Sequence, residues 1–490
     1  MMQRLRFFCA LWIAKLLTRA LKAVGRPATQ LPGKTALRIC PDFLGRIGRP
    51  KTLIAVTGTN GKTTVCNILA DALEYLGYRV ANNSFGSNLN AGIASTLLAD
   101  ATLSGKARAQ FALLEVDERS SRLIYPFITP DYLVCTNLFR DSVGRNAHTE
   151  YIAYVINSAL PPVTRLILNA DDLVSSMLGT PSNPRSYFGI DRLNSDTPTA
   201  DSLSRDIIVC AECGSLLEYE YVRYHHLGKA HCPNCTFGSH DSDYLVTDID
   251  DAGQILTLQT PEGNLPFRLI AHSIFNVYNQ LAALAVLLEL GIEHERLQAA
   301  FGAVKLAESR FSEEKIGDVS LVMQLAKGQN AIACSRAFDY IAGAPGRKAV
   351  ILNLDDYFDA RGGSENITWL YDCDYEYLTD PSIAQLVLGG VRSYDHYLRL
   401  LIAGVSPERM ERTRDEQDTA DLVDLEGIDA IYICYDVYTV PMANAVRDRL
   451  RARLQGRRQE GAGTSTEAAA NAGTKPGVER DARAGRGDAP

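Results

Sequence analysis

The sequence predicts an α/β protein in which a P-loop domain carries an inserted four-cysteine zinc ribbon and precedes a smaller Rossmann-like α/β domain. Three observations support this fold class. A glycine-rich loop directly follows an apolar strand, two CxxC pairs stand eighteen residues apart, and strand-like and helix-like runs alternate toward the end of the chain. At 490 residues the chain is long enough for two or three domains with ample cores.

The glycine-rich loop reads VTGTNGKTT over residues 56–64 and follows the apolar run LIAV. A strand that ends in such a turn and enters a helix directs several backbone N–H groups at one point, where the helix dipole also favours phosphate. A chance turn is the alternative, but strand, turn and helix signals all occur in the required order. Lys62 would reach the outer phosphates of ATP, and Thr63 would bind Mg²⁺. We predict an ATP site formed by Thr57, Gly58, Thr59, Asn60, Gly61, Lys62, Thr63 and Thr64.

The two CxxC pairs predict a closed metal site. Four thiolates at this spacing can surround Zn²⁺ tetrahedrally, and such a site is structural rather than catalytic. His231 as a replacement ligand, or a redox role for one pair, are alternatives that four available thiolates make unnecessary. A nucleic-acid-reading ribbon would need a basic surface, yet Arg223 and Lys229 are the only Lys or Arg residues between the pairs. We predict a structural zinc ribbon over residues 206–242, with ligands Cys210, Cys213, Cys232 and Cys235.

Both ends of the sequence differ from its middle. Residues 1–41 contain no acidic residue, and Lys15, Arg19, Lys22 and Arg26 are spaced to share one helical face. This basic helix either packs on its own domain, the more common arrangement, or touches an anionic membrane surface. Charges interrupt its apolar run too often for a membrane span. At the other end, residues 456–490 are expected to be disordered, because they offer little apolar surface to bury.

Composition bounds the function further. Hydrophobic residues make up 46% and charged residues 22%, as is typical of a globular enzyme. The formal net charge of −8 argues against non-specific nucleic-acid binding. Apart from the ribbon, the eleven cysteines are scattered, which favours the reducing cytoplasm over a secreted disulfide framework. We therefore expect a cytoplasmic protein, with peripheral attachment at the inner face of the cell membrane as an option.

The loop and five later segments resemble the Mur ligase superfamily, which joins amines to carboxylates through acyl-phosphate intermediates. The resemblance implies that Glu115 binds Mg²⁺ together with Thr63, although a buried charge partner is an alternative role for Glu115. It also implies that Asp171, Asn276 and Arg310 contact the nucleotide, with Ser312 standing where the family often has an acid. The segments are NSFGSN (83–88), EVDE (115–118), TNLFRD (136–141), LNADD (168–172) and FNVYN (275–279).

The ribbon inside the ATP-binding domain narrows the resemblance to the MurT family, over about residues 30–450. The segment LPGKTAL at 31–37 and the phrase NLFRD also resemble that family. This similarity and the composition of the two ends of the sequence predict two main domains, preceded by an N-terminal lead-in and followed by a tail. The expected parts are a lead-in over 1–50, a central ATP-binding domain over 51–312 that contains the 206–242 ribbon, a MurT-type domain over 313–455, and the tail.

The resemblance to MurT implies an ADP-forming carbon–nitrogen ligase that acts on lipid II. The α-carboxylate of D-glutamate in the lipid II stem peptide would be activated as an acyl phosphate. Lys62 would contact the phosphates of ATP, and Glu115 would bind Mg²⁺. Ammonia would then convert it to D-isoglutamine. The ammonia would come from a GatD-like glutamine amidotransferase subunit, since no cysteine here lies in a glycine elbow typical of a glutaminase nucleophile. Nucleic acid is not an expected partner.

The segment TWLYDCDYE at 368–376 is similar to a MurT segment in which a tryptophan precedes a DxDxE run. In that family an aspartate of the synthetase subunit is thought to complete a Cys–His pair of the partner. Asp372 is the first candidate here, with Asp374 and Asp359 behind it. The alternative for each is that it caps a helix or binds water. The glycine-rich loop at 360–366 is longer than expected, which leaves the alignment of these aspartates open by several residues.

Three other functions compete with this interpretation. An amino-acid-adding Mur ligase or a folylpolyglutamate synthetase would use an amino acid rather than ammonia, but neither accounts for the ribbon or the 369–376 segment. A non-catalytic ATP-binding scaffold is disfavoured by the presence of both Thr63 and Glu115. A zinc-ribbon nucleic-acid ATPase is disfavoured by the acidic charge.

Overall fold

The computed structural model describes residues 2–83, 87–141, 148–199, 202–304, 311–326, 329–355 and 367–471, with only the backbone at 311 and 458–471. Asp359, Arg310 and residues 84–86 of the NSFGSN segment lie outside the described residues. The chain divides into two compact units. The first unit comprises Met1–Ser309, Gln329–Arg336 and Asn366–Asp374, and the second comprises Arg310–Gly328, Ala337–Glu365 and Tyr375–Pro490.

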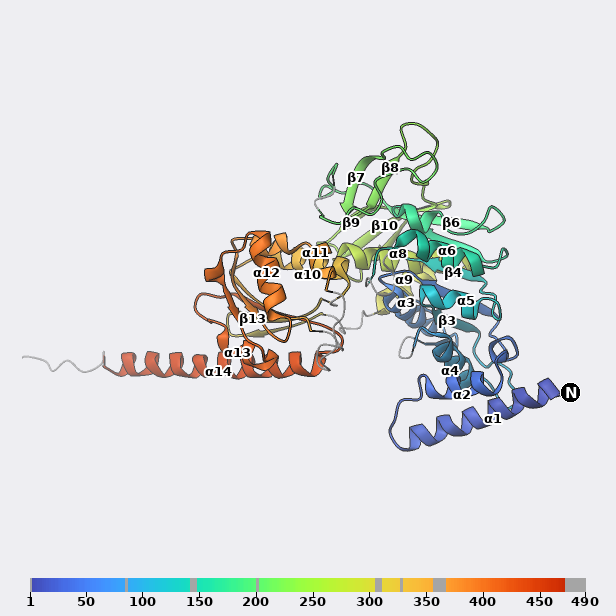
Figure 1. Ribbon diagram of the computed structural model, residues 1–490, viewed down its shortest axis with the longest axis horizontal. Coiled ribbons are helices and arrows are strands. Elements are labelled where there is room, and N and C mark those ends of the chain that lie inside the picture. The colour runs from blue at the N-terminus through green and yellow to red at the C-terminus, as the bar shows by residue number, and fades with distance from the viewer. Residues whose placement is uncertain are drawn as a thin grey trace, which may run out of the picture. The chain divides into compact units, whose positions relative to one another are not determined.

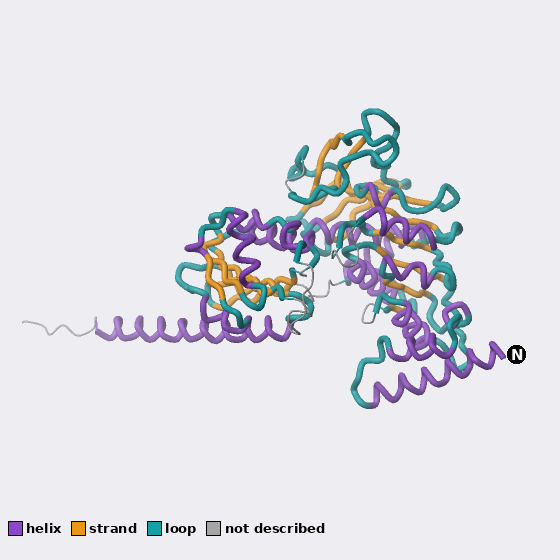
Figure 2. The backbone as a smooth tube through the Cα atoms, viewed as in Figure 1, coloured by secondary structure: helices purple, strands orange, loops and turns teal. Residues whose placement is uncertain are grey.

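The first unit is built on a nine-stranded sheet of order β11-β10-β9-β6-β5-β4-β1-β3-β2 (Figures 1 and 2). Along this order, neighbouring strands from β9 to β2 are parallel. At the other edge, β10 pairs antiparallel with both β9 and β11. Strands β1, β3, β4 and β5 are short, mostly apolar runs, as expected for strands buried on both faces. The strands are β1 (Thr52–Thr57), β2 (Val80–Asn82), β3 (Phe111–Glu115), β4 (Tyr132–Cys135), β5 (Arg165–Asn169), β6 (Arg185–Ile190), β9 (Tyr244–Asp250), β10 (Ile255–Thr260) and β11 (Gly263–Arg268).

Alternate residues of each central strand enter different cores. In β1, Ile54 and Val56 pack with helices α3 (Lys62–Tyr75), α8 (Ile274–Glu289) and α9 (His294–Ala303). Leu53 and Ala55 pack on the other side with the N-terminal helices, because successive side chains of a strand point to opposite faces. The helices of that second face are α1 (Met2–Ala23), α2 (Leu31–Ile39), α4 (Asn90–Asp100), α5 (Ser121–Ile124), α6 (Thr149–Ala159) and α7 (Leu173–Ser176).

The predicted cysteine ribbon is a small sheet of its own. Strands β7 (Glu218–Tyr224) and β8 (Leu227–His231) come between β6 and β9 along the chain and pair antiparallel with each other. Its connection is tight at His225, which has a positive φ of 50°. The four cysteines flank this hairpin on both sides along the chain. The insertion therefore leaves the order of the main sheet intact.

The second unit contains a six-stranded sheet of order β12-β13-β17-β14-β15-β16. Every pair is parallel except β12 with β13. This arrangement agrees with the predicted Rossmann-like α/β fold. The strands are β12 (Phe311–Ile316), β13 (Val319–Leu325), β14 (Lys348–Asn353), β15 (Ile383–Leu388), β16 (Met410–Arg412) and β17 (Ala430–Tyr435), with helices α12 (Ser393–Ala403), α13 (Thr419–Leu422) and α14 (Val440–Asn471). Helix α10 (Ala331–Gly343) begins within residues of the first unit, to which α11 (Trp369–Asp372) also belongs.

Helix α14 differs from the prediction for the C-terminal tail. It continues to Asn471, whereas disorder was expected from residue 456. Residues 456–471 combine four alanines with three glycines and a Thr-Ser-Thr run, so local helix propensity does not account for the extension. The rest of the predicted tail, residues 472–490, lies outside the described residues. Among the described helices, none has the combined length and apolarity needed to cross a bilayer.

Candidate active site

The glycine-rich loop lies at the carboxyl end of β1, in the middle of the main sheet, and α3 begins at Lys62. Gly58 and Gly61 have positive φ values of 127° and 89°. A Cβ atom on Gly58 would lie 2.2 Å from Thr136 Oγ1, and one on Gly61 would lie 2.1 Å from Asn279 Oδ1. Both positions therefore require glycine, and the loop can approach its neighbours as a phosphate-binding loop must.

The sequence-predicted Mg²⁺ ligands lie together. The Thr63 hydroxyl donates a hydrogen bond to Glu115 Oε2 at 2.8 Å. Asn83 holds the main chain of Glu115 from both sides, since its Oδ1 accepts from the Glu115 N–H at 2.7 Å and its Nδ2 donates to the Glu115 carbonyl at 2.9 Å. A hydroxyl beside a carboxylate, at the start of a helix that faces phosphate, is a donor set that suits Mg²⁺. Thr63 and Glu115 could therefore hold the ion.

Lys62 is paired with an acid that the sequence reasoning missed. Its Nζ lies 2.7 Å from Glu118 Oε1, and both side chains are almost fully buried. Burial alone would lower the pKa of Lys62, but the charge of Glu118 outweighs it and raises the pKa above its ordinary value. The ammonium group therefore stays charged. The only available signal for Glu118 was its place three residues after Glu115 in the EVDE segment.

The segment after β4 clamps the loop from the neighbouring strand. Asn137 Oδ1 accepts from the Asn60 N–H at 3.0 Å, and the Thr136 hydroxyl donates to the Asn60 carbonyl at 2.6 Å. Asn330, from a distant part of the chain, donates to Asn60 Oδ1 at 3.4 Å. The TNLFRD segment was recognised as a family motif, but no sequence pattern marked Asn330.

Asp171 and Asn276, both expected to contact the nucleotide, have different surroundings. Burial raises the pKa of Asp171, although its Oδ2 accepts hydrogen bonds from the Tyr278 hydroxyl at 2.5 Å and from Arg223 Nη1 at 3.0 Å. Asn276 Oδ1 accepts from Asn279 Nδ2 at 3.2 Å, and it is Asn279 that lies against Gly61. Asn276 thus supports the loop through Asn279, and Arg223 ties Asp171 to the ribbon strand β7.

The two described candidate aspartates of the 368–376 segment have different surroundings. Asp374 is 3% exposed, and its Oδ1 accepts from the Leu203 N–H at 2.7 Å. Asp372 has a side chain that is 37% exposed and lies 3.7 Å from Arg140 Nη1. Arg140 also pairs with Asp206 at 2.5 Å. Asp374 is therefore fixed within the fold, whereas Asp372 remains accessible from solvent.

The four ribbon cysteines converge. Their sulfur atoms all lie within 4.8 Å of one another, with Cys210 and Cys235 at 3.5 Å and Cys213 and Cys232 at 3.4 Å. These distances are too long for disulfides and suit the edges of a tetrahedron around a metal. The N–H groups of Glu212 and Asn234 donate to the sulfurs of Cys210 and Cys232 at 3.4 Å, as expected where thiolates carry negative charge. The cluster can hold a metal ion.

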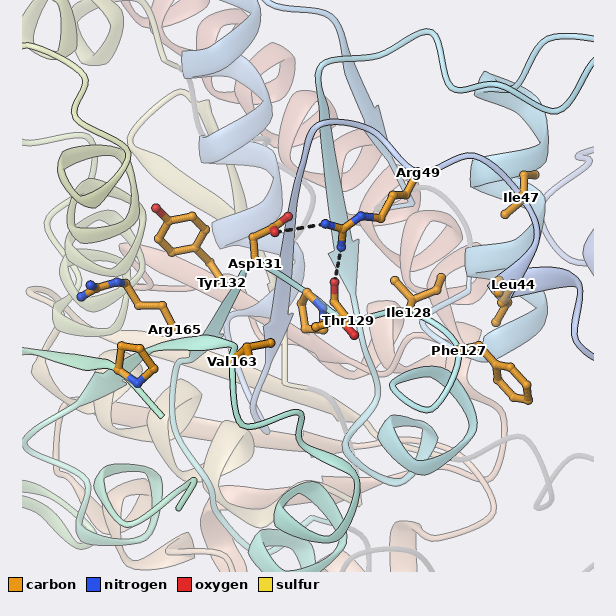
Figure 3. Close-up of a pocket in the computed structure, with 13 residues that line it drawn as sticks. Leu44, Ile47, Arg49, Phe127, Ile128, Thr129, Asp131, Tyr132, Val163 and Arg165 are labelled. Carbon is orange, nitrogen blue, oxygen red and sulfur yellow. Dashed lines mark hydrogen bonds and ion pairs between the residues drawn. The ribbon is translucent and has the colours of Figure 1, made fainter. Parts of the chain in front are cut away.

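A cavity of about 670 Å³ lies at the opposite ends of the strands (Figure 3). It is lined by Tyr132 and Arg165, the first residues of β4 and β5, and by Arg49 just before β1. Arg49 already contacts the Thr129 carbonyl at 2.5 Å and Asp131 at 3.3 Å. Ligands of open parallel sheets bind beyond the carboxyl ends of the strands. The phosphate loop, not this cavity, therefore marks the candidate active site.

Comparisons with known proteins agree with this geometry. The family model for the Mur ligase middle domain matches residues 56–205, and that for the MurT ligase C-terminal domain matches 327–440. The lipid II isoglutaminyl synthase (glutamine-hydrolyzing) subunit MurT of Streptococcus pneumoniae is 30% identical over 397 residues, covering 80% of this chain and 86% of that protein. The subunit of the same name from Staphylococcus aureus strain COL is 29% identical over 406 residues, covering 82% and 89%.

Solved structures show the same fold. A pseudomurein peptide ligase type C from Methanothermus fervidus matches with a TM-score of 0.61 and 18% identity, covering 84% of this chain and 81% of that one. The MurF ligase from Thermotoga maritima, solved in complex with ADP, matches with a TM-score of 0.57 and 14% identity, covering 87% and 85%. The predicted fold class and family resemblance are confirmed. The chain is a ligase of the Mur type and belongs to the MurT family.

Proposed function

We propose that the chain is the synthetase subunit of a two-component enzyme that amidates lipid II. The α-carboxylate of the D-glutamate residue in the stem peptide would be the acceptor, and D-isoglutamine the product. The observation that carries the proposal is the similarity to subunits of this name over most of both chains, including the C-terminal domain. The Thr63–Glu115 pair beside the glycine loop supports chemistry at ATP rather than a scaffold role.

In the proposed reaction, an oxygen of the substrate carboxylate attacks the γ-phosphorus of ATP, and ADP leaves. Ammonia then attacks the acyl carbon, and phosphate leaves with the oxygen that came from the carboxylate. Lys62 and the loop N–H groups would orient the phosphates and offset their charge. Thr63 and Glu115 would hold Mg²⁺, which neutralises phosphate charge when bound.

A structural Zn²⁺ ion in the ribbon belongs to the proposal. Four thiolates are a soft, closed donor set, and zinc commonly occupies such sites. The ribbon strand β7 carries Arg223, whose side chain is almost fully buried between Asp171 and Asp196. Through this pair of contacts the metal site would support the wall of the nucleotide site.

The cysteines of this chain support a separate glutaminase as the source of ammonia. All eleven cysteines lie among the described residues, and four of them form the metal cluster. A glutaminase nucleophile needs a thiol whose pKa is lowered. Among the seven cysteines outside the cluster, burial raises the pKa of Cys66 and Cys135, and burial beside Asp42 raises that of Cys40 to about 11. We infer that a GatD-like amidotransferase subunit supplies ammonia.

Asp372 is the proposed carboxylate that completes the partner's Cys–His pair. It is accessible, whereas Asp374 is fixed by the Leu203 N–H and Asp359 lies outside the described residues. Arg140 beside Asp372 would help to orient the carboxylate. The carboxylate can then orient the partner's histidine.

The test measures ADP release and product mass with lipid II, Mg²⁺ and ATP, using ammonium, glutamine plus the glutaminase subunit, or an amino-acid mixture. Wild type should amidate with ammonium and with glutamine. D372N should lose glutamine-dependent turnover by about 10³-fold while keeping ammonium-dependent turnover.

The matched control is D395N, because Asp395 is similarly exposed and also lies beside an arginine. It should keep both activities. Full glutamine use by D372N would remove Asp372 from this role. Turnover with an amino acid alone would instead make the chain a peptide-forming Mur ligase, like the solved structures that share its fold.

A further inference from the structure

Helix α1 has an apolar face that the fold does not cover. Met2, Leu5, Trp12, Ile13 and Leu16 are between 49% and 77% exposed. Met2, Leu5, Cys9, Trp12 and Leu16 follow one another at intervals of three and four residues, so they lie along one side of the helix. A row of large exposed apolar side chains on one helix face marks an interaction surface. We call this row the outer face of α1.

The opposite side of α1 already satisfies the needs of the fold. Phe7, Ala10, Leu11 and Ala14 are buried in the core that α1 shares with α2 and α4. Lys15 Nζ donates to the Leu98 carbonyl at 2.7 Å and to that of Ala101 at 2.5 Å, at the end of α4. Trp12 belongs to the outer face, and its indole N–H donates to the Leu103 carbonyl at 3.0 Å, which ties the edge of that face to the first unit. The helix is therefore anchored on the first unit, where Figure 1 shows α2 and α4 on one side of it, and the side chains of its outer face are exposed.

Charge indicates what covers the outer face. The chain as a whole carries a net charge of −8, yet residues 1–41 contain no Asp or Glu. Arg4, Arg6, Arg19, Lys22 and Arg26 are all exposed. At 100° per residue, Arg4, Arg19 and Lys22 fall on one side of the outer face and Arg6 on the other. If two copies paired through this face, the cations that flank it would lie near those of the other copy, and this repulsion argues against a second copy of the chain as the occupant.

We propose that α1 lies in the plane of an anionic membrane, with its outer face in the headgroup–acyl boundary and its flanking cations on lipid phosphates. An exposed tryptophan beside aliphatic side chains, flanked by Arg and Lys, is the pattern of an interfacial amphipathic helix. The inference rests on α1 alone. If the proposed function also holds, the helix brings the enzyme to the surface that carries its lipid-linked substrate.

The test is co-sedimentation of the full-length chain with vesicles of phosphatidylglycerol and phosphatidylcholine, against vesicles of phosphatidylcholine alone. Binding should need the anionic lipid and weaken with salt. L5S/L16S should weaken binding by about tenfold or more, because it removes two inserted side chains, and R19E/K22E should do the same through charge. The chain has two tryptophans, of which Trp369 is buried, so a blue shift of emission on vesicle addition should report Trp12 and vanish in W12F.

Matched controls separate the surface from general effects. K51E/R122E reverses two exposed cations elsewhere in the first unit and should leave vesicle binding unchanged. Each variant should keep the circular dichroism of wild type and its ammonium-dependent turnover on a short-chain, water-soluble substrate analogue. If the wild-type protein showed no such turnover, the proposed function would be contradicted, but the vesicle-binding result would still hold. The inference would be overturned if the wild-type chain did not bind anionic vesicles, or if L5S/L16S bound them as well as the wild type. It would also be overturned if the wild type formed a dimer that L5S/L16S dissociates.

Discussion

At the scale of single residues, the Thr63–Glu115 contact makes the sharpest claim about catalysis. E115Q keeps the shape and the hydrogen bond of Glu115 but removes its charge, so it should raise the Mg²⁺ concentration needed for half-maximal ADP release by about tenfold or more. T63A should have a similar effect, while T63S, which keeps the hydroxyl, should restore wild-type behaviour. The measurement is a Mg²⁺ titration of ADP release at saturating ATP.

E150Q is the control for charge loss at an exposed glutamate on α6. It should leave the Mg²⁺ titration unchanged. An unchanged titration in E115Q would assign Glu115 to the alternative role of a buried charge partner.

The residue scale also shows what the sequence could and could not predict. The glycine loop was predictable because all of its chemistry lies within nine consecutive residues. Glu118 and Asn330 were not, since their roles depend on contacts across 56 and 270 positions of the chain. The sequence ranked Asp372 ahead of Asp374 by resemblance alone, and it could not predict that Asp374 is buried while Asp372 is accessible.

At the scale of elements, the ribbon is expected to depend on its metal. C213S should reduce bound zinc from about one ion per chain to nearly none, because three thiolates leave the site open. The melting temperature should fall by about 5 °C or more, since β7 positions Arg223 between Asp171 and Asp196. Mass-spectrometric metal analysis and thermal unfolding check both. C9S, which alters a cysteine outside the cluster, should retain zinc.

A buried carboxyl group in the second unit, that of Glu416, predicts an effect of pH on stability. Burial, together with the carboxylates of Asp355, Asp415 and Asp436, raises the pKa of Glu416 to about 8. The folded state therefore binds this proton more tightly than the unfolded chain. Its contribution is fully present at acidic pH and is lost as the pH rises from the ordinary glutamate range through about 8.

E416Q, which cannot ionise, should lose about 5 °C less melting temperature than wild type between pH 5 and 8. Thermal unfolding at several pH values measures the difference. Parallel curves for the two proteins would show that Glu416 is already ionised in the folded state.

Elements also show where periodicity alone falls short. The sequence predicted α1 as a basic amphipathic helix, but its outward apolar face becomes evident only once Phe7 and Leu11 are seen to bury the other side. Likewise, α14 extends to Asn471 where composition predicted disorder, and the helix propensity of its Gly, Ser and Thr residues does not explain the extension.

At the scale of the whole molecule, the order of units follows from sequence. The parallel runs and the CxxC pairs predicted a P-loop sheet, an inserted ribbon and a second α/β sheet, and the three sheets of the described residues follow this order along the chain. The antiparallel edge β9–β10–β11 was not predicted. Its strands alternate apolar and polar residues around turns, a weaker pattern than that of the buried parallel strands.

The central claim, that a carboxylate is activated by phosphorylation and then amidated, has a direct isotopic test. Lipid II labelled with ¹⁸O in the D-glutamate α-carboxyl would be incubated with the chain, Mg²⁺, ATP and ammonium. Released phosphate should carry an oxygen from the label, and the product should be lighter by the difference between OH and NH₂. Unlabelled phosphate, or a product heavier by an amino acid, would contradict it.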